Sequence, residues 1–188
     1  MNHFQFPVSF GTVFIFWNDD GLVSQIKLSA ERLMKSQHDQ VPLAVAHLME
    51  SLSRFFFYGE PLRSIPWELL DQSHWSDFQR SVYSVISQIP HGETRTYGWV
   101  AQQLGKKSAS RAVGQALKKN PFPILIPCHR VVGVSSQGGF MGERNPKHPV
   151  GLLKNKLIGL EEEYLNPVFS FLPQALLRSD SECLSSVV

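Results

Sequence analysis

The segment 76–119 alternates between residues that begin helices and residues that end them, which restricts the second half of the chain to short helices. The first begins at Ser76, where Gln79 three positions later completes a capping-box pattern. Apolar residues follow at helical spacing until Pro90 and Gly92, which stop the helix. We therefore predict a mainly helical C-terminal domain.

Two more short helices are expected after this one. Thr96 can cap a helix that ends at Gly105, and Ser108 can cap another that runs to about residue 119. Such a pair is a candidate helix-turn-helix, although many helix pairs share the pattern. Gly114, mid-helix where glycine costs roughly 1 kcal/mol relative to alanine, either admits another backbone or serves packing. The stripe expected to dock this helix on the domain is Ala112, Val113, Ala116 and Leu117.

The first half has the pattern of a small α/β unit. Residues 8–17 and 22–28 are strand-like and flank a turn at 18–21, which predicts an opening hairpin. Residues 41–57 have helical spacing, and a glycine and a proline end that helix. We expect an N-terminal α/β domain with a supporting role at 1–73, a domain with a winged-helix-like helix-turn-helix at 74–165, and a tail of unassigned role at 166–188.

Positive charge is concentrated in one segment. Residues 94–142 contain no Asp or Glu and seven Lys or Arg, and since the whole chain has a net charge of +2, the rest carries −5. Such asymmetry favours a polyanionic partner such as nucleic acid. A soluble basic face without a partner is the alternative.

Composition limits the remaining classes. Hydrophobic residues make up 43% and charged residues 18%, as in an ordinary globular protein with a real core. No apolar run is long enough for a membrane span, and no secretory signal is evident. The two cysteines, Cys128 and Cys183, have no zinc-binding spacing and cannot build a disulfide framework. We expect a cytoplasmic protein without a metal site.

Cys128 and His129 are a candidate reactive pair. A thiol is a strong nucleophile only as the thiolate, and an adjacent base or cation helps to form it. The dipeptide alone is weak evidence, because a lone cysteine in an apolar run is usually a small core residue. Residues 124–126, which lead into Pro127, have the pattern of a short buried strand.

A longer pattern surrounds this pair. From residue 120 the sequence is NPFPILIPCHRVV, which closely resembles the active-site signature of the O6-alkylguanine-DNA alkyltransferases, also called methylated-DNA–protein-cysteine methyltransferases. Segments 78–90, 92–98 and 110–116 resemble the family's first conserved helix, its tyrosine-bearing turn and its recognition helix. The first half resembles the family only loosely.

This resemblance implies direct DNA repair. An alkyl group would move from O6-alkylguanine in double-stranded DNA to Cys128 in a single turnover, without a cofactor. His129 would deprotonate Cys128 through a water, and Glu161 would orient the histidine, with Glu162 and Glu163 as neighbouring alternatives. The catalytic residues implied by position are Cys128, His129, Glu161, Asn120 as a hinge, and Tyr97 as a contact to the flipped nucleotide.

The resemblance also implies how DNA is held. Arg111 would fill the gap left by the flipped base, small residues would let the helix enter the minor groove, and lysines would contact phosphates without reading sequence. The expected DNA-binding residues are Arg111, Ala112, Gly114, Gln115, Lys106, Lys107 and Lys118. The base pocket would contain Val131, Phe140 and Met141, with the carbonyls of Cys128 and Val131 accepting from the guanine amine.

The sequence departs from the family at one loop. Residues 141–149 form a longer connection than the family's usual loop, and Met141 stands where a small polar residue is expected, which affects substrate size preference. The alternatives are a lesion-binding protein without transfer, whose relatives lack the cysteine present here, and an alkylation-sensing regulator. Because one cysteine serves one lesion, a monomer is the default.

Overall fold

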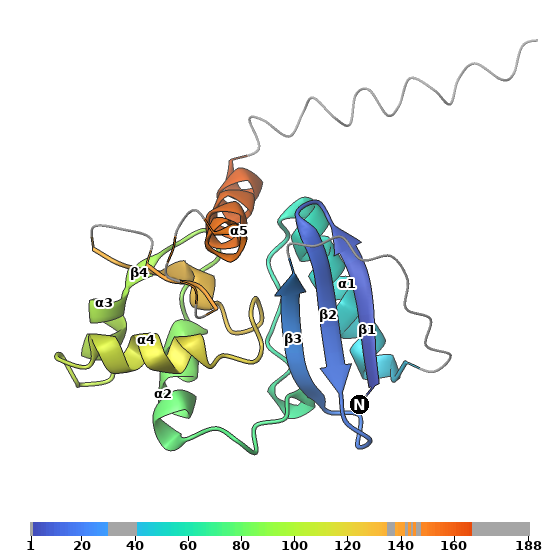
Figure 1. The fold of residues 1–188 in the computed structure, drawn as a ribbon, viewed down its shortest axis with the longest axis horizontal. Helices are drawn as coiled ribbons and strands as arrows, with labels where there is room; N and C mark the ends of the chain where they lie inside the picture. Colours follow the sequence, from blue (N-terminus) through green and yellow to red (C-terminus); the bar gives the residue numbers. More distant parts are fainter. Residues whose placement is uncertain are drawn as a thin grey trace, which may run out of the picture.

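A three-stranded antiparallel sheet opens the computed structural model, which describes residues 2–29, 41–134, 138–141, 143, 145 and 148–166 (Figure 1). The strands are β1 (Asn2–Val8), β2 (Gly11–Trp17) and β3 (Val23–Ser29), in the order β1-β2-β3. The expected hairpin is confirmed as β2 and β3, but β1 was not expected, and Val8 belongs to it. Its register pairs Phe4 with Ile15 and Phe6 with Val13, so alternate residues of β1 join the apolar face.

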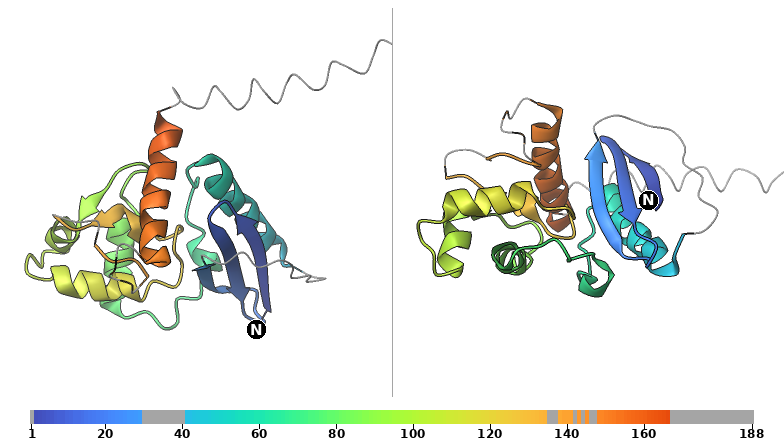
Figure 2. Two further views of the ribbon diagram at one scale, coloured as in Figure 1. Left: turned by 45° about the horizontal axis from the view of Figure 1, so that its top comes forward. Right: turned by 60° about the horizontal axis from the view of Figure 1, so that its bottom comes forward.

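Helix α1 (Leu43–Tyr58) covers one face of this sheet (Figures 1 and 2). Its buried side is apolar, and Gly59 ends it with φ of 71°, a left-handed conformation that glycine adopts without strain. The 3-10 turn η1 (Trp67–Leu69) follows in the connection to the second half. The buried residues of α1 are Val45, Leu48, Leu52, Phe55 and Phe56.

The described residues after η1 form the helices α2 (Asp77–Ile86), α3 (Tyr97–Gln103), α4 (Ser110–Lys118) and α5 (Pro149–Leu165). The capping box at Ser76 is confirmed, as is the Thr96 cap, whose hydroxyl accepts from the Trp99 amide. The expected Ser108 cap is wrong. A turn in which the Ala109 amide donates to the Lys106 carbonyl (2.8 Å) delays the start of α4, whose N-terminus has no side-chain cap.

The expected strand at 124–126 is also wrong. These residues are buried but irregular, because the neighbouring prolines at 123 and 127 have no amide to donate and Ile124 has φ of 76°. The actual strands are short: β4 (Arg95–Thr96) pairs in parallel with β5 (Val131–Val132). In this parallel pair the 3-10 turn η2 (Cys128–Arg130), which precedes β5, lies at the same end as the residues that precede β4, and α3 begins at the other end.

Helix α5 lies between the two halves, as Figures 1 and 2 show, and contacts both α1 and η2. It therefore links the sheet layer to the turn that carries Cys128. None of the helices in the described residues is long and apolar enough to cross a bilayer.

Candidate active site

Cys128 is one of the residues that line a pocket of about 300 Å³. The thiol residue is only 5% exposed, so the pocket is its route to a substrate. Helix α4 forms one wall, and the segment after β5 forms the other. The lining includes Tyr97, Arg111, Gly114, Gln115, Lys118, Phe140, Met141 and Glu143.

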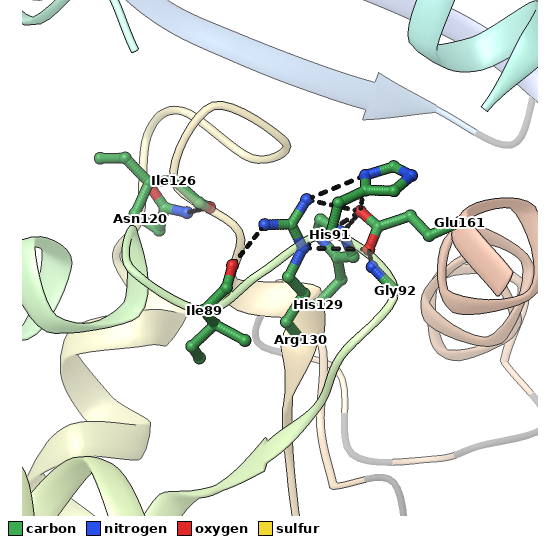
Figure 3. Close-up of polar contacts among 8 residues, drawn as sticks. All are labelled: Ile89, His91, Gly92, Asn120, Ile126, His129, Arg130 and Glu161. Atoms are coloured by element: carbon green, nitrogen blue, oxygen red, sulfur yellow. Dashed lines mark hydrogen bonds and ion pairs between the residues drawn. The ribbon is translucent and has the colours of Figure 1, made fainter. Parts of the chain in front are cut away.

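Behind Cys128, a buried histidine meets a buried carboxylate (Figure 3). The Nε2 of His129 lies 2.7 Å from Oε1 of Glu161 on α5, and both residues are at most 1% exposed. Glu162 and Glu163 are exposed, so Glu161 is the member of the three that reaches the histidine.

Arg130 clamps the same carboxylate from the other side (Figure 3). Its Nε donates to Oε2 of Glu161 at 3.0 Å and its Nη2 to Oε1 at 2.9 Å, while Nη1 donates to the Ile89 carbonyl at 2.7 Å. The Gly92 amide donates to Oε2 at 2.9 Å. Arg130 is one of the seven positive residues in segment 94–142, but its guanidinium is bound to a carboxylate 31 residues away along the chain.

These contacts determine the protonation states. Burial opposes ionisation of Glu161, but the hydrogen bonds from His129 and Arg130, together with the positive charge of Arg130, prevail and lower its pKa to about 2. Burial lowers the pKa of His129 and outweighs the hydrogen bond and negative charge of Glu161, which act to raise it, while the charge of Arg130 adds to the lowering. The imidazole is therefore neutral near pH 7. With Nε2 donating to Glu161, Nδ1 carries the lone pair, and it has no hydrogen-bond partner among the described residues.

The thiol itself is not activated at rest. Burial raises the pKa of Cys128, and a hydrogen bond from Asn120 and the charge of Lys154 only partly offset this. A base is therefore needed before Cys128 can act as a nucleophile.

Asn120 joins the end of α4 to the segment before Cys128 (Figure 3). Its Nδ2 donates to the Ile126 carbonyl at 2.9 Å, and its Oδ1 accepts from the Phe122 amide at 3.0 Å. The residue thus lies where the sequence placed a hinge between the helix-turn-helix and the reactive turn.

Tyr97 begins α3 and lies in the pocket wall. Its hydroxyl donates to the Gly139 carbonyl at 3.4 Å. Gly138, with φ of 69°, packs so closely that an added Cβ would lie 2.9 Å from the Tyr97 ring. Burial raises the pKa of Tyr97, so its hydroxyl keeps its proton at neutral pH.

The outer face of α4 carries most of the expected DNA contacts. Arg111, Gln115 and Lys118 are exposed, as are Lys106 and Lys107 before the helix. Ala112 is exposed too, so it does not belong to the docking stripe, which consists of the buried Val113, Ala116 and Leu117.

Gly114 faces the pocket rather than the core. A Cβ added there would meet only the Tyr97 ring, at 3.8 Å, which is an ordinary contact. Packing within this chain therefore does not require a glycine at this position.

Of the three expected base-pocket residues, two line the pocket. Phe140 and Met141 do so, whereas Val131 does not, and its carbonyl accepts from Nζ of Lys154 at 2.6 Å. Sequence reasoning missed Lys154 and Glu143. A usable signal for Lys154 existed: it lies two helical turns before Glu161, so both charged residues fall on the buried face of α5 with Leu153 and Leu157.

No cluster of His, Cys, Asp or Glu within the described ranges could hold a metal ion. Cys183 lies outside those ranges, so the structure does not test its expected lack of a role.

Comparison with known proteins agrees with this geometry. The family model described as "6-O-methylguanine DNA methyltransferase, DNA binding domain" matches residues 77–163. A methylated-DNA–protein-cysteine methyltransferase of Methanothermobacter thermautotrophicus is 37% identical over 130 residues, covering 68% of this chain and 70% of the relative. This chain belongs to the methylated-DNA–protein-cysteine methyltransferase family. A relative from Methanosarcina acetivorans is 45% identical over 82 residues, which is 44% of this chain and 51% of that protein.

Solved structures of methyltransferases extend the likeness to the first half. Mycobacterium tuberculosis OGT in complex with DNA superposes with a TM-score of 0.64 at 30% identity, over 85% of this chain and 92% of that one. The O6-methylguanine-DNA methyltransferase of Pyrococcus kodakaraensis, at 24% identity and a TM-score of 0.54, covers 85% of this chain and 97% of its own and shares the fold. Alignments with the sequence relatives cover about half to two thirds of their lengths, whereas the structural matches cover nearly whole chains.

Proposed function

We propose that this protein repairs DNA directly, by moving an alkyl group from O6 of a damaged guanine to Cys128. The observation that carries the proposal is the position of Cys128: it lines a pocket that has the basic helix α4 as one wall, and a buried neutral histidine follows it in the chain. The sulfur–carbon bond forms as the carbon–O6 bond breaks. Cys128 becomes a thioether with no ready route back to a thiol, so each molecule acts once.

His129 is the proposed base. Glu161 fixes the Nε2–H tautomer, which leaves the Nδ1 lone pair to accept the thiol proton, directly or through a water. The carboxylate holds and orients the base, as the third group of a hydrolase triad does. Arg130 keeps that carboxylate ionised and in place.

Tyr97 is the proposed proton donor to the leaving guanine. Its hydroxyl is protonated at neutral pH and lies in the pocket wall, where a flipped base would enter. A proton delivered to guanine makes it a better leaving group. Phe140 and Met141 would pack against the base and its alkyl substituent.

We infer that α3 and α4 form the helix-turn-helix of a winged-helix-like unit that binds double-stranded DNA. The exposed lysines would contact phosphates, and Arg111 at the pocket mouth would replace the flipped base in the stack. The small Gly114 and Ala112 would let the helix approach the minor groove closely. Contacts of this kind read no sequence, as repair of randomly placed lesions requires.

The N-terminal unit, proposed at residues 1–73, has a supporting role in this scheme. The ring of Phe55 on α1 lies 6.2 Å, centre to centre, from the rings of both His91 and His129. A Cβ on Gly59 would lie 2.6 Å from the Leu160 carbonyl oxygen, so α1 ends in close contact with α5. The sheet and α1 would thus keep water away from the relay behind Cys128. A monomeric state and a cytoplasmic location stay predictions.

Intact-protein mass spectrometry tests the main proposal. The full chain is mixed with a duplex that carries one O6-methylguanine, alongside Cys128→Ala. We expect wild type to become heavier by one methyl group, mapped to the Cys128 peptide, and the variant to stay unchanged. If neither changes mass while both bind the lesion duplex, transfer is wrong and lesion recognition without chemistry replaces it.

Gly114→Ala tests the docking of α4. Because the added methyl meets only an ordinary contact, we expect folding to be retained or stabilised by up to about 1 kcal/mol, while affinity for duplex DNA falls. Gel-shift titration and thermal unfolding measure the two effects. Unchanged DNA affinity would show that this helix face does not approach the backbone of DNA.

A further inference from the structure

Glu143 is an acidic residue in the lining of the pocket that contains Cys128. The other charged residues that the structure describes in this lining, Arg111 and Lys118, are basic and belong to α4. Glu143 comes from the connection 141–149, in which the sequence departs from the family. The pocket therefore has a basic wall and, in a part particular to this chain, an acidic residue.

Backbone hydrogen bonds hold Glu143 in the pocket wall. Its amide donates to the Phe140 carbonyl at 2.9 Å, and its carbonyl accepts from the Phe140 amide at 2.9 Å, so the two residues pair like opposite positions of antiparallel strands. Met141 lies in the turn between them, with φ of 48°. This turn brings Phe140, Met141 and Glu143 together on one side of the pocket, and all three line it.

The side chain of Glu143 is held by the residues that follow it. Its Oε1 accepts a hydrogen bond from the Asn145 amide at 2.7 Å, and its Oε2 lies 3.7 Å from Nδ1 of His148. The side chain is 32% exposed, so it is only partly surrounded by water. The carboxylate therefore has a defined place at the pocket wall.

We propose that Glu143 is a specificity-determining residue that selects O6 substituents by charge: it slows the transfer of groups that carry a carboxylate and favours neutral or cationic groups. The inference rests on the proposed function. A substituent on O6 must approach Cys128, so it enters the same pocket of about 300 Å³ that Glu143 lines. Like charges repel more strongly there than in bulk water, because protein rather than solvent surrounds them.

The basic residues of the opposite wall do not remove this effect. In the proposed complex Lys118 contacts phosphates and Arg111 occupies the gap in the base stack, so DNA takes up their charges. The bonds that form and break are those of methyl transfer: sulfur bonds to carbon as the carbon–O6 bond breaks. Charge selection therefore changes the rate without a new chemical step.

Two duplexes test the inference, one with O6-carboxymethylguanine and one with O6-carbamoylmethylguanine. The two substituents have nearly the same size and shape, but the first is an anion and the second is neutral. Single-turnover rates of Cys128 modification are measured on the full chain by intact-protein mass spectrometry. The quantity compared is the ratio of the carbamoylmethyl rate to the carboxymethyl rate, from which any loss of folded protein cancels.

In Glu143→Gln this ratio should fall about tenfold, because the carboxymethyl group is no longer repelled. Glu162→Gln removes an exposed carboxylate of α5 that is not part of the lining, so it is the matched control and should keep the wild-type ratio. An equal ratio in wild type and Glu143→Gln would overturn charge selection.

A cationic substituent should respond in the opposite direction. The rate for an O6-(2-aminoethyl) group, relative to an O6-(2-hydroxyethyl) group, should fall in Glu143→Gln. If both charged substituents instead gain or both lose speed relative to their neutral partners, size or polarity is responsible and the proposal fails. If wild type transfers none of these groups while it binds the duplexes, the proposed function fails and the inference falls with it.

Discussion

Two cations lie close to the reactive turn, the partly buried Arg130 and the buried Lys154, and their surroundings differ. Arg130, behind Cys128, is bound to a carboxylate by three of its hydrogen bonds. Lys154, on the pocket side, is bound by carbonyl groups and an aromatic face. The first charge is neutralised in the resting protein, while the second is not.

The difference separates a charge that is paired with a carboxylate from one that is not. A buried ion pair with good geometry holds elements together and changes little during a reaction. A buried charge without an anionic partner raises the free energy of the resting protein and is relieved when an anion appears. The two cations should therefore respond in opposite ways to pH and to removal of a partner.

The largest effect on stability is expected when Arg130 loses its carboxylate partner. Glu161→Gln leaves the largely covered guanidinium of Arg130 without its anion, which should lower the free energy of unfolding by about 3 kcal/mol. Urea denaturation measures the change. Glu162→Gln, an exposed neighbour on the same helix, is the control and should differ from wild type by less than about 0.5 kcal/mol. Equal effects of the two substitutions would show that the ion pair between Arg130 and Glu161 contributes little to stability.

Acid should reduce the contribution that Glu161 makes to the free energy of unfolding. The pKa of Glu161 falls from an ordinary 4.5 to about 2 on folding, so its contribution is complete above pH 4.5 and is lost as pH falls toward 2. The shift corresponds to about 3 kcal/mol. The difference in unfolding free energy between wild type and Glu161→Gln should therefore shrink over this range, as urea denaturation at stepped pH would show. A constant difference would contradict the assignment.

Raising the pH should instead increase the contribution of Lys154 to the free energy of unfolding. Burial lowers the pKa of Lys154 from 10.5 to about 8, so between these values the folded chain binds fewer protons than the unfolded chain. Stability from this group therefore rises as pH increases through that window. Relative to Lys154→Met, wild type should gain about 2 kcal/mol between pH 8 and 9.5. If urea denaturation gives parallel curves of unfolding free energy against pH for wild type and Lys154→Met, burial does not destabilise the charged form of this lysine.

The smallest effect concerns the aromatic cover over the relay. Phe55→Leu keeps most of the apolar volume and should cost less than about 1.5 kcal/mol of stability. Because leucine leaves the His129 ring less shielded from water, methyl transfer should slow while DNA affinity stays unchanged. Single-turnover transfer assays and gel-shift titration separate the two. A parallel loss of both would place the defect in overall folding.

Local sequence signals predicted much of the fold. The capping box at Ser76 and the Thr96 cap were visible because each depends on residues three positions apart. Strand β1 was missed although apolar residues recur at every second position, Phe4, Phe6 and Val8, so the signal was present. The strand expected at 124–126 failed because apolar composition was given more weight than the flanking prolines.

The candidate site was predictable where the family resemblance names positions. Cys128, His129 and Glu161 could be named in this way, and the structure brings them together. The partner of Arg130 was not predictable from charge along the chain, because the clamp joins positions 31 residues apart. Lys154 could be recognised as buried from helical spacing, but its carbonyl partners lie on β5 and in the pocket segment, which only the fold brings together.

The two hydrogen bonds of the Asn120 side chain have a consequence for protein engineering. Since its side chain closes the segment between α4 and the reactive turn at both ends, the number of residues between the helix and the thiol is fixed. An insertion or deletion there would change the reach from the helix to the thiol. Residues 110–132 should therefore be exchanged between scaffolds as one cassette, with length conserved before sequence.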